Sequence, residues 1–311
     1  MSGIVWSICA IGLVMAVGWE ARRRGIIGPD GSSLLATLTY WVTSPAMLFH
    51  AISTTDVLAV LGGPLVAAAG CGVGAALVFV LIGAGPLRLR GGDLALGAMS
   101  ASLNNAAYIG IPIALYVLGD ATHVVPILVF QLGFFTPMFF VLADVTGSGR
   151  APTPSSVVLT IVKNPMVIAA AFGFVFAALK IPVPKVLAVS TSMLGDAAAP
   201  VILLAFGASL VGARFPLHDR HTAAVLVASA CKLLAQPLIA YGIGLLLGMR
   251  GVDLMTVTIM AGLPTAQNAF IAASRAGTGE RIAQGAALLT TLASLPLTIC
   301  TAGIFHAFLG V

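Results

Sequence analysis

Apolar residues run along this chain in blocks about as long as one bilayer crossing, and short stretches rich in Gly, Pro and charged residues separate the blocks. A transmembrane helix needs about 20 consecutive apolar residues. On that criterion the sequence predicts ten helices, at residues 3–19, 32–50, 57–85, 93–119, 121–145, 157–179, 185–212, 221–248, 252–275 and 282–309. The third helix begins later if Gly62-Gly63-Pro64 is a loop. We expect an all-α polytopic membrane protein.

Composition supports the same fold class. Of the 311 residues, 59% are hydrophobic and 8% are charged, against about 25% charged residues in a soluble domain. So few charges cannot cover a water-soluble surface, so the expected partner is the lipid bilayer. The 15 Lys and Arg residues lie mostly between the apolar blocks without aromatic interleaving, which argues against a nucleic-acid partner.

The basic residues also predict an orientation. With the N-terminus outside, eleven of them fall in cytoplasmic loops or at the bordering helix ends, and three fall in outer loops. The first set is Arg22, Arg23, Arg24, Arg88, Arg90, Arg150, Lys163, Arg214, Arg220, Arg275 and Arg281, and the second is Lys180, Lys185 and Arg250. The positive-inside rule then places both termini on the extracytoplasmic side.

A short motif occurs twice along the chain. Residues 90–94 read Arg-Gly-Gly-Asp-Leu and residues 250–254 read Arg-Gly-Val-Asp-Leu, each at the start of an apolar segment. Two halves of five helices each must enter the membrane from opposite sides, because five is odd. We therefore predict a first five-helix repeat at residues 1–150, a short linker at 151–156 and an inverted second repeat at 157–311.

Both segments that follow this motif, the predicted fourth and ninth helices, are interrupted by polar and helix-breaking residues. The interruptions hold Asn104, Asn105, Tyr108 and Pro112 in the first half and Pro264, Thr265, Gln267 and Asn268 in the second. Unwound backbone survives in a membrane only where protein or a wet cavity satisfies it. Paired breaks in two halves indicate a transport site. The alternative is two kinked but continuous helices whose amides bridge to neighbours.

Two ionisable residues lie within predicted helices. Lys232 could neutralise a bound carboxylate, pair with Asp196, load and unload a proton, or cap backbone carbonyls without meeting substrate. Asp196 either has a functional role or sits near a helix end. We treat both as candidates for ion coupling or charge relay.

Several segments together resemble the bacterial branch of the auxin efflux carrier family. They are residues 22–27 (Arg-Arg-Arg-Gly-Ile-Ile), 104–112 (Asn-Asn-Ala-Ala-Tyr-Ile-Gly-Ile-Pro), 194–200 (Leu-Gly-Asp-Ala-Ala-Ala-Pro), 206–210 (Phe-Gly-Ala-Ser-Leu) and 263–270 (Leu-Pro-Thr-Ala-Gln-Asn-Ala-Phe). The similarity spans nearly the whole chain in order and spacing.

The resemblance implies a ten-helix fold of two inverted repeats, related to sodium/proton antiporters and bile acid symporters, with helices 4 and 9 broken and crossing. It also implies a scaffold part that often mediates homodimers, an elevator-like transport part, and a bacterial cytoplasmic membrane location. Carried over by position, the crossover residues are Asn105, Pro112, Pro264, Thr265 and Asn268. Ser44, beside Pro45 in helix 2, is implied to approach the site.

The expected function is a secondary transporter for small organic anions, such as mono- or dicarboxylates or auxin-like acids. The crossover holds amides but no carboxylate, which favours proton coupling or uniport. A sodium-coupled organic acid symporter and an anion-selective channel remain as alternatives. An enzyme is not expected, because the sequence has no His-Glu-x-x-His, no Gly-x-Ser-x-Gly and no clustered His. We likewise predict no cofactor and no metal site.

Overall fold

The computed structural model describes residues 2–54, 62–110, 113–114, 118, 121–147, 162–212 and 221–309. Throughout these residues the regular structure is helical, apart from one isolated antiparallel bridge between Asn104 and Thr265. The predicted all-α class is therefore confirmed. The predicted linker at 151–156 and Pro112 lie outside the described residues.

The helices follow the apolar blocks. In the first half they are α1 (Ser2–Arg23), α2 (Gly31–Leu38), α3 (Ser44–Ser53), α4 (Gly63–Ala84), α5 (Gly91–Ser100), α7 (Val125–Phe130) and α8 (Thr136–Gly147). In the second half they are α10 (Pro165–Ala178), α11 (Lys185–Asp196), α12 (Ala198–Ser209), α13 (Thr222–Ala230), α14 (Gln236–Leu246), α15 (Gly251–Ala261), α16 (Asn268–Ala276) and α17 (Glu280–Leu309). Shorter turns are η1 (Thr39–Thr43), η2 (Ala106–Gly110), η3 (Ala121–Val124), η4 (Gln131–Phe135) and η6 (Cys231–Ala235).

Several of these helices have the length and apolarity of membrane spans. Among the described residues, four stretches qualify: Gly63–Ala84, Val125–Gly147, Lys185–Ser209 and Thr222–Leu246. A pair of segments, Glu280–Ser294 and Pro296–Ala307, bent by 42°, qualifies as a fifth span if taken together. The chain is thus a multi-pass membrane protein.

Three of the long helices contain a widened, π-helical turn that ends two residues before a proline. The turns are η1, η4 and η6, and the prolines are Pro45, Pro137 and Pro237. Proline inside a helix lacks an N–H and its ring clashes with the carbonyl four residues back. The widened turn accommodates that defect by bonding five residues back, as when the Gln236 N–H donates to the Cys231 carbonyl. Each turn therefore changes the direction in which its polar side chains point.

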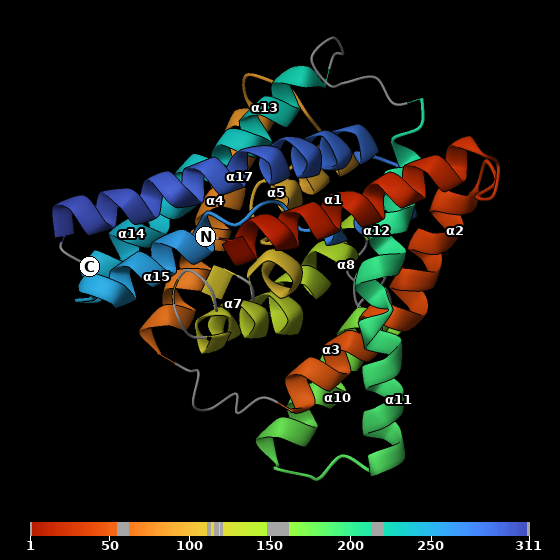
Figure 1. Ribbon diagram of the computed structural model, residues 1–311, viewed down its shortest axis with the longest axis horizontal. Helices are drawn as coiled ribbons and strands as arrows, with labels where there is room; N and C mark the ends of the chain where they lie inside the picture. Colours follow the sequence, from red (N-terminus) through yellow and green to blue (C-terminus); the bar gives the residue numbers. More distant parts are fainter. Residues whose placement is uncertain are drawn as a thin grey trace.

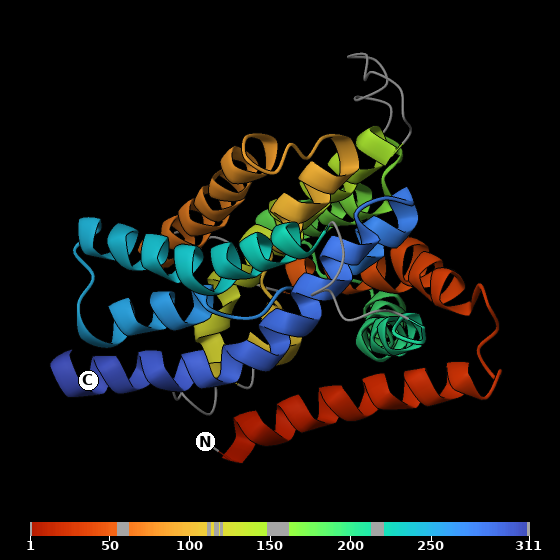
Figure 2. The ribbon, with the colours of Figure 1, turned by 90° about the horizontal axis from the view of Figure 1, so that it is seen from above.

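The helices form two bundles, seen in two views in Figures 1 and 2. The first bundle consists of α1, α2–η1–α3, α10 and α11–α12, in which α1 packs on α12 and α10 and α11 pack on α3. The second bundle consists of α4, α5, α7–η4–α8, α13–η6–α14, α15, α16 and α17. Each bundle draws helices from both halves of the sequence. The broken helices and their supports all lie in the second bundle.

Candidate functional site

Two helices end where the sequence predicts breaks, and their unwound ends pair with each other. α5 ends at Ser100 and α15 ends at Ala261. Beyond them the Asn105 N–H donates to the Pro264 carbonyl at 2.8 Å, and the Ala266 N–H donates to the Leu103 carbonyl at 3.0 Å. Residues 101–105 and 262–267, which we call the crossing strands, thus satisfy part of each other's backbone. Unwound chain requires such partners inside a membrane.

Side chains from two further helices satisfy the backbone at the bridge. The Gln131 amide, from η4, accepts from the Asn104 N–H and donates to the Asn104 carbonyl at 2.8 Å. The Thr290 hydroxyl, from α17, accepts from the Thr265 N–H at 3.0 Å. Thr265 in turn donates its hydroxyl to the Ser100 carbonyl at 2.7 Å. Each unwound strand therefore has a polar partner from a neighbouring helix.

Lys232 and Gln236 brace the crossover from a third side. The Lys232 ammonium, whose side chain is 0% exposed, donates to the Ala261 carbonyl at 2.8 Å and to Gln236 Oε1 at 2.7 Å. Gln236 Nε2 donates to the Ser102 carbonyl at 3.0 Å. Helix C-termini carry unpaired carbonyls and a partial negative charge. The amino group of Lys232 and the amide of Gln236 therefore donate to the carbonyl ends of both broken helices.

The structure does not pair Lys232 with Asp196. Asp196, the last residue of α11, is exposed and accepts a long bond of 3.4 Å from the Ser192 hydroxyl. Of the roles that the sequence left open for Lys232, the contacts found are those of a carbonyl cap.

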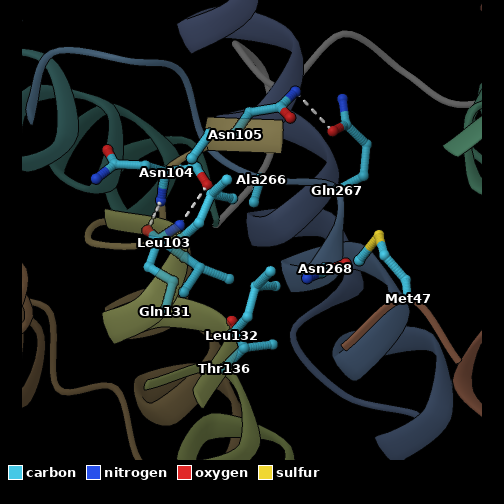
Figure 3. A pocket seen from close by; sticks show the side chains of 12 residues that line it. Met47, Leu103, Asn104, Asn105, Gln131, Leu132, Thr136, Ala266, Gln267 and Asn268 are labelled. Atoms are coloured by element: carbon cyan, nitrogen blue, oxygen red, sulfur yellow. Dashed lines mark hydrogen bonds between the residues drawn. The ribbon is translucent and has the colours of Figure 1, made fainter. Parts of the chain in front are cut away.

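A pocket of about 380 Å³, counted with its open side, lies against the crossing strands (Figure 3). Its lining residues are Met47, Leu103, Asn104, Asn105, Ala106, Leu128, Gln131, Leu132, Thr136, Ala266, Gln267 and Asn268. All of these side chains are neutral. Asn105 Nδ2 donates to Gln267 Oε1 at 2.8 Å, so that amides from the two halves face each other.

The pocket also receives a helix N-terminus. α16 begins at Asn268, and within the described part of the chain no carbonyl accepts from the backbone N–H of Gln267 or Asn268. Such free N–H groups, together with the positive end of the helix dipole, favour an anion. The Thr136 hydroxyl, buried in the pocket wall, adds a further polar atom with no partner among the described residues.

The predicted site residues occupy different places around this pocket. Asn104, Asn105, Gln267 and Asn268 line it, although the Asn104 amide points away from Gln267 and Asn268 (Figure 3). Pro264 and Thr265 lie in the crossing strand behind the lining. Ser44 is buried on α3 outside the lining, and Met47, one turn further along, reaches the pocket instead. The Tyr108 side chain, like Pro112, lies outside what the structure describes.

Sequence reasoning missed the contribution of the helix that contains η4. Gln131 and Thr136 line the pocket, yet neither was singled out. The available signal was the one used for the broken helices, namely polar residues next to a proline, here Pro137, inside an apolar segment.

The sequence is similar to those of known transport proteins. The model of the family described as "Membrane transport protein" matches residues 4–301. A protein of Rhizobium meliloti (strain 1021) named "Putative malonate transporter" is 29% identical over 274 residues, which cover 84% of this chain and 83% of that protein. An "Uncharacterized transporter" of Methanothermobacter thermautotrophicus is 22% identical over 298 residues, covering 94% of this chain and 95% of its own. The chain therefore belongs to the membrane transport protein family, that of the auxin efflux carriers, and is a transporter rather than an enzyme.

Proposed function

We propose that this protein is a secondary carrier for small organic anions, with malonate and similar short carboxylates as the first substrates to test. The observation that carries the proposal is the uncharged amide pocket at the N-terminus of α16, beside the paired unwound segments of the two broken helices. The relative named for malonate supports the choice of substrate class.

An anion would be held here without a basic side chain in the lining. The free N–H groups of Gln267 and Asn268 supply donors, and the dipole of α16 adds a partial positive charge. The Asn105 and Gln267 amides, already oriented by their mutual bond, present further polar atoms. Weak neutral donors suit a carrier, because a substrate must be released as readily as it is bound.

The arrangement of the bundles favours alternating access of the elevator type. All crossover and pocket elements except Met47 belong to the second bundle, and Met47 comes from α3 of the first. Sliding of the second bundle along the first would carry the pocket, apart from its contact with Met47, from one membrane face to the other. We further propose a homodimer through the first bundle, in the scaffold role that the resemblance to auxin efflux carriers implies.

The contacts of Lys232 and Gln236 favour proton coupling or uniport over sodium coupling. The carbonyls of Ala261 and Ser102, at the C-terminal ends of the broken helices, are acceptors that a bound cation would need. Here an ammonium and an amide occupy them. We also infer a bacterial cytoplasmic membrane, as the resemblance implies, and both termini outside, because of the basic loops.

The test is flux in proteoliposomes that contain the purified protein. We expect saturable uptake of radiolabelled malonate, accelerated by malonate on the opposite side and unaffected by a sodium gradient. Flux that rises linearly with concentration and shows no acceleration would support a channel instead. Strong dependence on a sodium gradient would support the symporter. Absence of both uptake and binding for short carboxylates would refute the proposal.

A further inference from the structure

A second polar cluster, separate from the pocket, joins the two bundles through Tyr40. The Tyr40 hydroxyl donates to Asp144 Oδ2 at 3.1 Å. The Arg275 guanidinium carbon lies 5.5 Å from the centre of the Tyr40 ring and 5.6 Å from that of Trp41, within the range of a cation–π contact. Tyr40 is 1% exposed, so both contacts are made by a fixed, buried ring.

The cluster connects elements that would have to move relative to each other. Tyr40 belongs to η1 of the first bundle, whereas Asp144 belongs to α8 and Arg275 to α16 of the second. In a carrier whose bundles slide, these contacts cannot persist through the transport cycle. They are therefore specific to one state.

The cluster lies on one side of the pocket, at a similar depth on all three helices. The helix with Tyr40 reaches the pocket at Met47, the helix with Asp144 reaches it at Thr136, and the helix with Arg275 reaches it at Asn268. Seven or eight residues separate the members of each pair, which is about 10–12 Å along a helix. Three helices thus line the pocket and converge again about two turns beyond it, in the direction in which α16 runs.

A further contact between the bundles lies in the same region. Gln284 Nε2 of α17 donates to the Ser209 hydroxyl of α12 at 2.8 Å. α17 follows α16 after a short turn, and Gln284 lies in its first two turns. Its contact with the end of α12 is consistent with closure on the side of Arg275.

We propose that Tyr40, Asp144 and Arg275 form a gate that closes the pocket on the side where α16 ends. The gate rests on the proposed carrier function, because it has a role only if the bundles move. Tyr40 is the central member of the gate, because its hydroxyl donates to Asp144 and its ring contacts the guanidinium of Arg275. Separation of Tyr40 from the second bundle opens the pocket to that face.

Cysteine accessibility tests the gate without any substrate. Met47→Cys, in a background with the four native cysteines replaced by alanine, places a thiol in the pocket wall. A membrane-impermeant maleimide is applied to vesicles of each orientation. With the gate intact, we expect modification from the gate face to be much slower than modification from the opposite face. Tyr40→Phe removes one hydroxyl and should raise the rate from the gate face at least tenfold.

Two further variants make the result unambiguous. Arg275→Gln changes an exposed residue, so it tests the gate even if Tyr40→Phe fails to fold, and it should act in the same direction. Tyr241→Phe removes a hydroxyl from α14, where the ring packs on Phe305 away from the cluster, and should change nothing. Folded Tyr40→Phe and Arg275→Gln proteins that label like the parent would overturn the gate. Loss of carrier function would appear separately, as absent malonate flux in the unmodified protein.

Discussion

Lys232 donates a hydrogen bond to the carbonyl of Ala261, the last residue of α15, across 29 positions of sequence. A fully buried ammonium is normally paired with an acid. Here its partners are the carbonyl end of a broken helix and the side-chain oxygen of Gln236. The pairing explains how the unwound strand is held in place while its other face stays free for a ligand.

Replacing Lys232 with Met should therefore destabilise the crossover. The change leaves the Ala261 carbonyl and Gln236 Oε1 without their donor, at a cost of about 1–3 kcal/mol for each buried group that stays unpaired. We expect a lowered Tm of the purified protein and loss of malonate uptake. Leu234→Ala, at an exposed position of the same turn, is the control and should leave both nearly unchanged. A stable, active Lys232→Met protein would contradict the bracing role.

Asn105→Ala and Asn268→Ala should weaken malonate binding at least tenfold without unfolding the protein. Asn105→Ala removes the donor that orients Gln267, and Asn268→Ala removes a pocket amide at the start of α16. Isothermal titration of malonate measures the affinity, and circular dichroism checks the fold. Thr191→Ala, on α11 outside the pocket lining, serves as the control. Affinity equal to that of the parent in both mutants would show that the ligand binds elsewhere.

Gln131→Leu should lower the free energy of unfolding by more than its volume change suggests. Gln131 satisfies both the N–H and the carbonyl of Asn104, so leucine leaves two buried backbone groups unpaired. Thr290→Val removes one acceptor, from the Thr265 N–H, and should have about half the effect on the free energy of unfolding. Thermal unfolding of the two variants measures the difference. The reverse ranking would mean that the two strands are not supported as described.

Gly207→Ala should disrupt the contact between α1 and α12 in the first bundle. A Cβ at this position would lie 1.9 Å from the Met15 carbonyl oxygen, and backbone cannot move aside cheaply. Overpacking of this kind costs about 1–3 kcal/mol or more, so we expect a reduced Tm. Gly242→Ala is the matched control, because a Cβ there meets no atom within 4 Å. Equal Tm values for the two variants would rule out tight packing at Gly207.

Much of the local structure is readable from the sequence because its causes are local. The two copies of the Arg-Gly-x-Asp-Leu motif adopt the same backbone, with Arg90 at φ −144° and ψ 164° and Arg250 at φ −141° and ψ 164°. The next residues, Gly91 and Gly251, have φ of 55° and 54°, a left-handed conformation that favours glycine. Nearly identical short sequences thus set the start of both broken helices.

The breaks themselves were predictable for the same kind of reason. A proline inside an apolar block removes a backbone donor and kinks or ends the helix, and α15 ends at Ala261, close before Pro264. The sequence thereby determined the helices, the membrane environment and the place of the unwound strands.

Only the tertiary structure decided which groups meet at those strands. The Asn105–Gln267 bond joins residues 162 positions apart, and the choice of Ala261 over Asp196 as the partner of Lys232 depends on how helices pack. The bond from Gln131 to the Asn104 carbonyl and the position of Met47 in the pocket lining likewise depend on contacts between helices. Apolar periodicity records which segments are buried in a bilayer, whereas the crossing of two helices depends on side-chain shapes summed over the whole bundle.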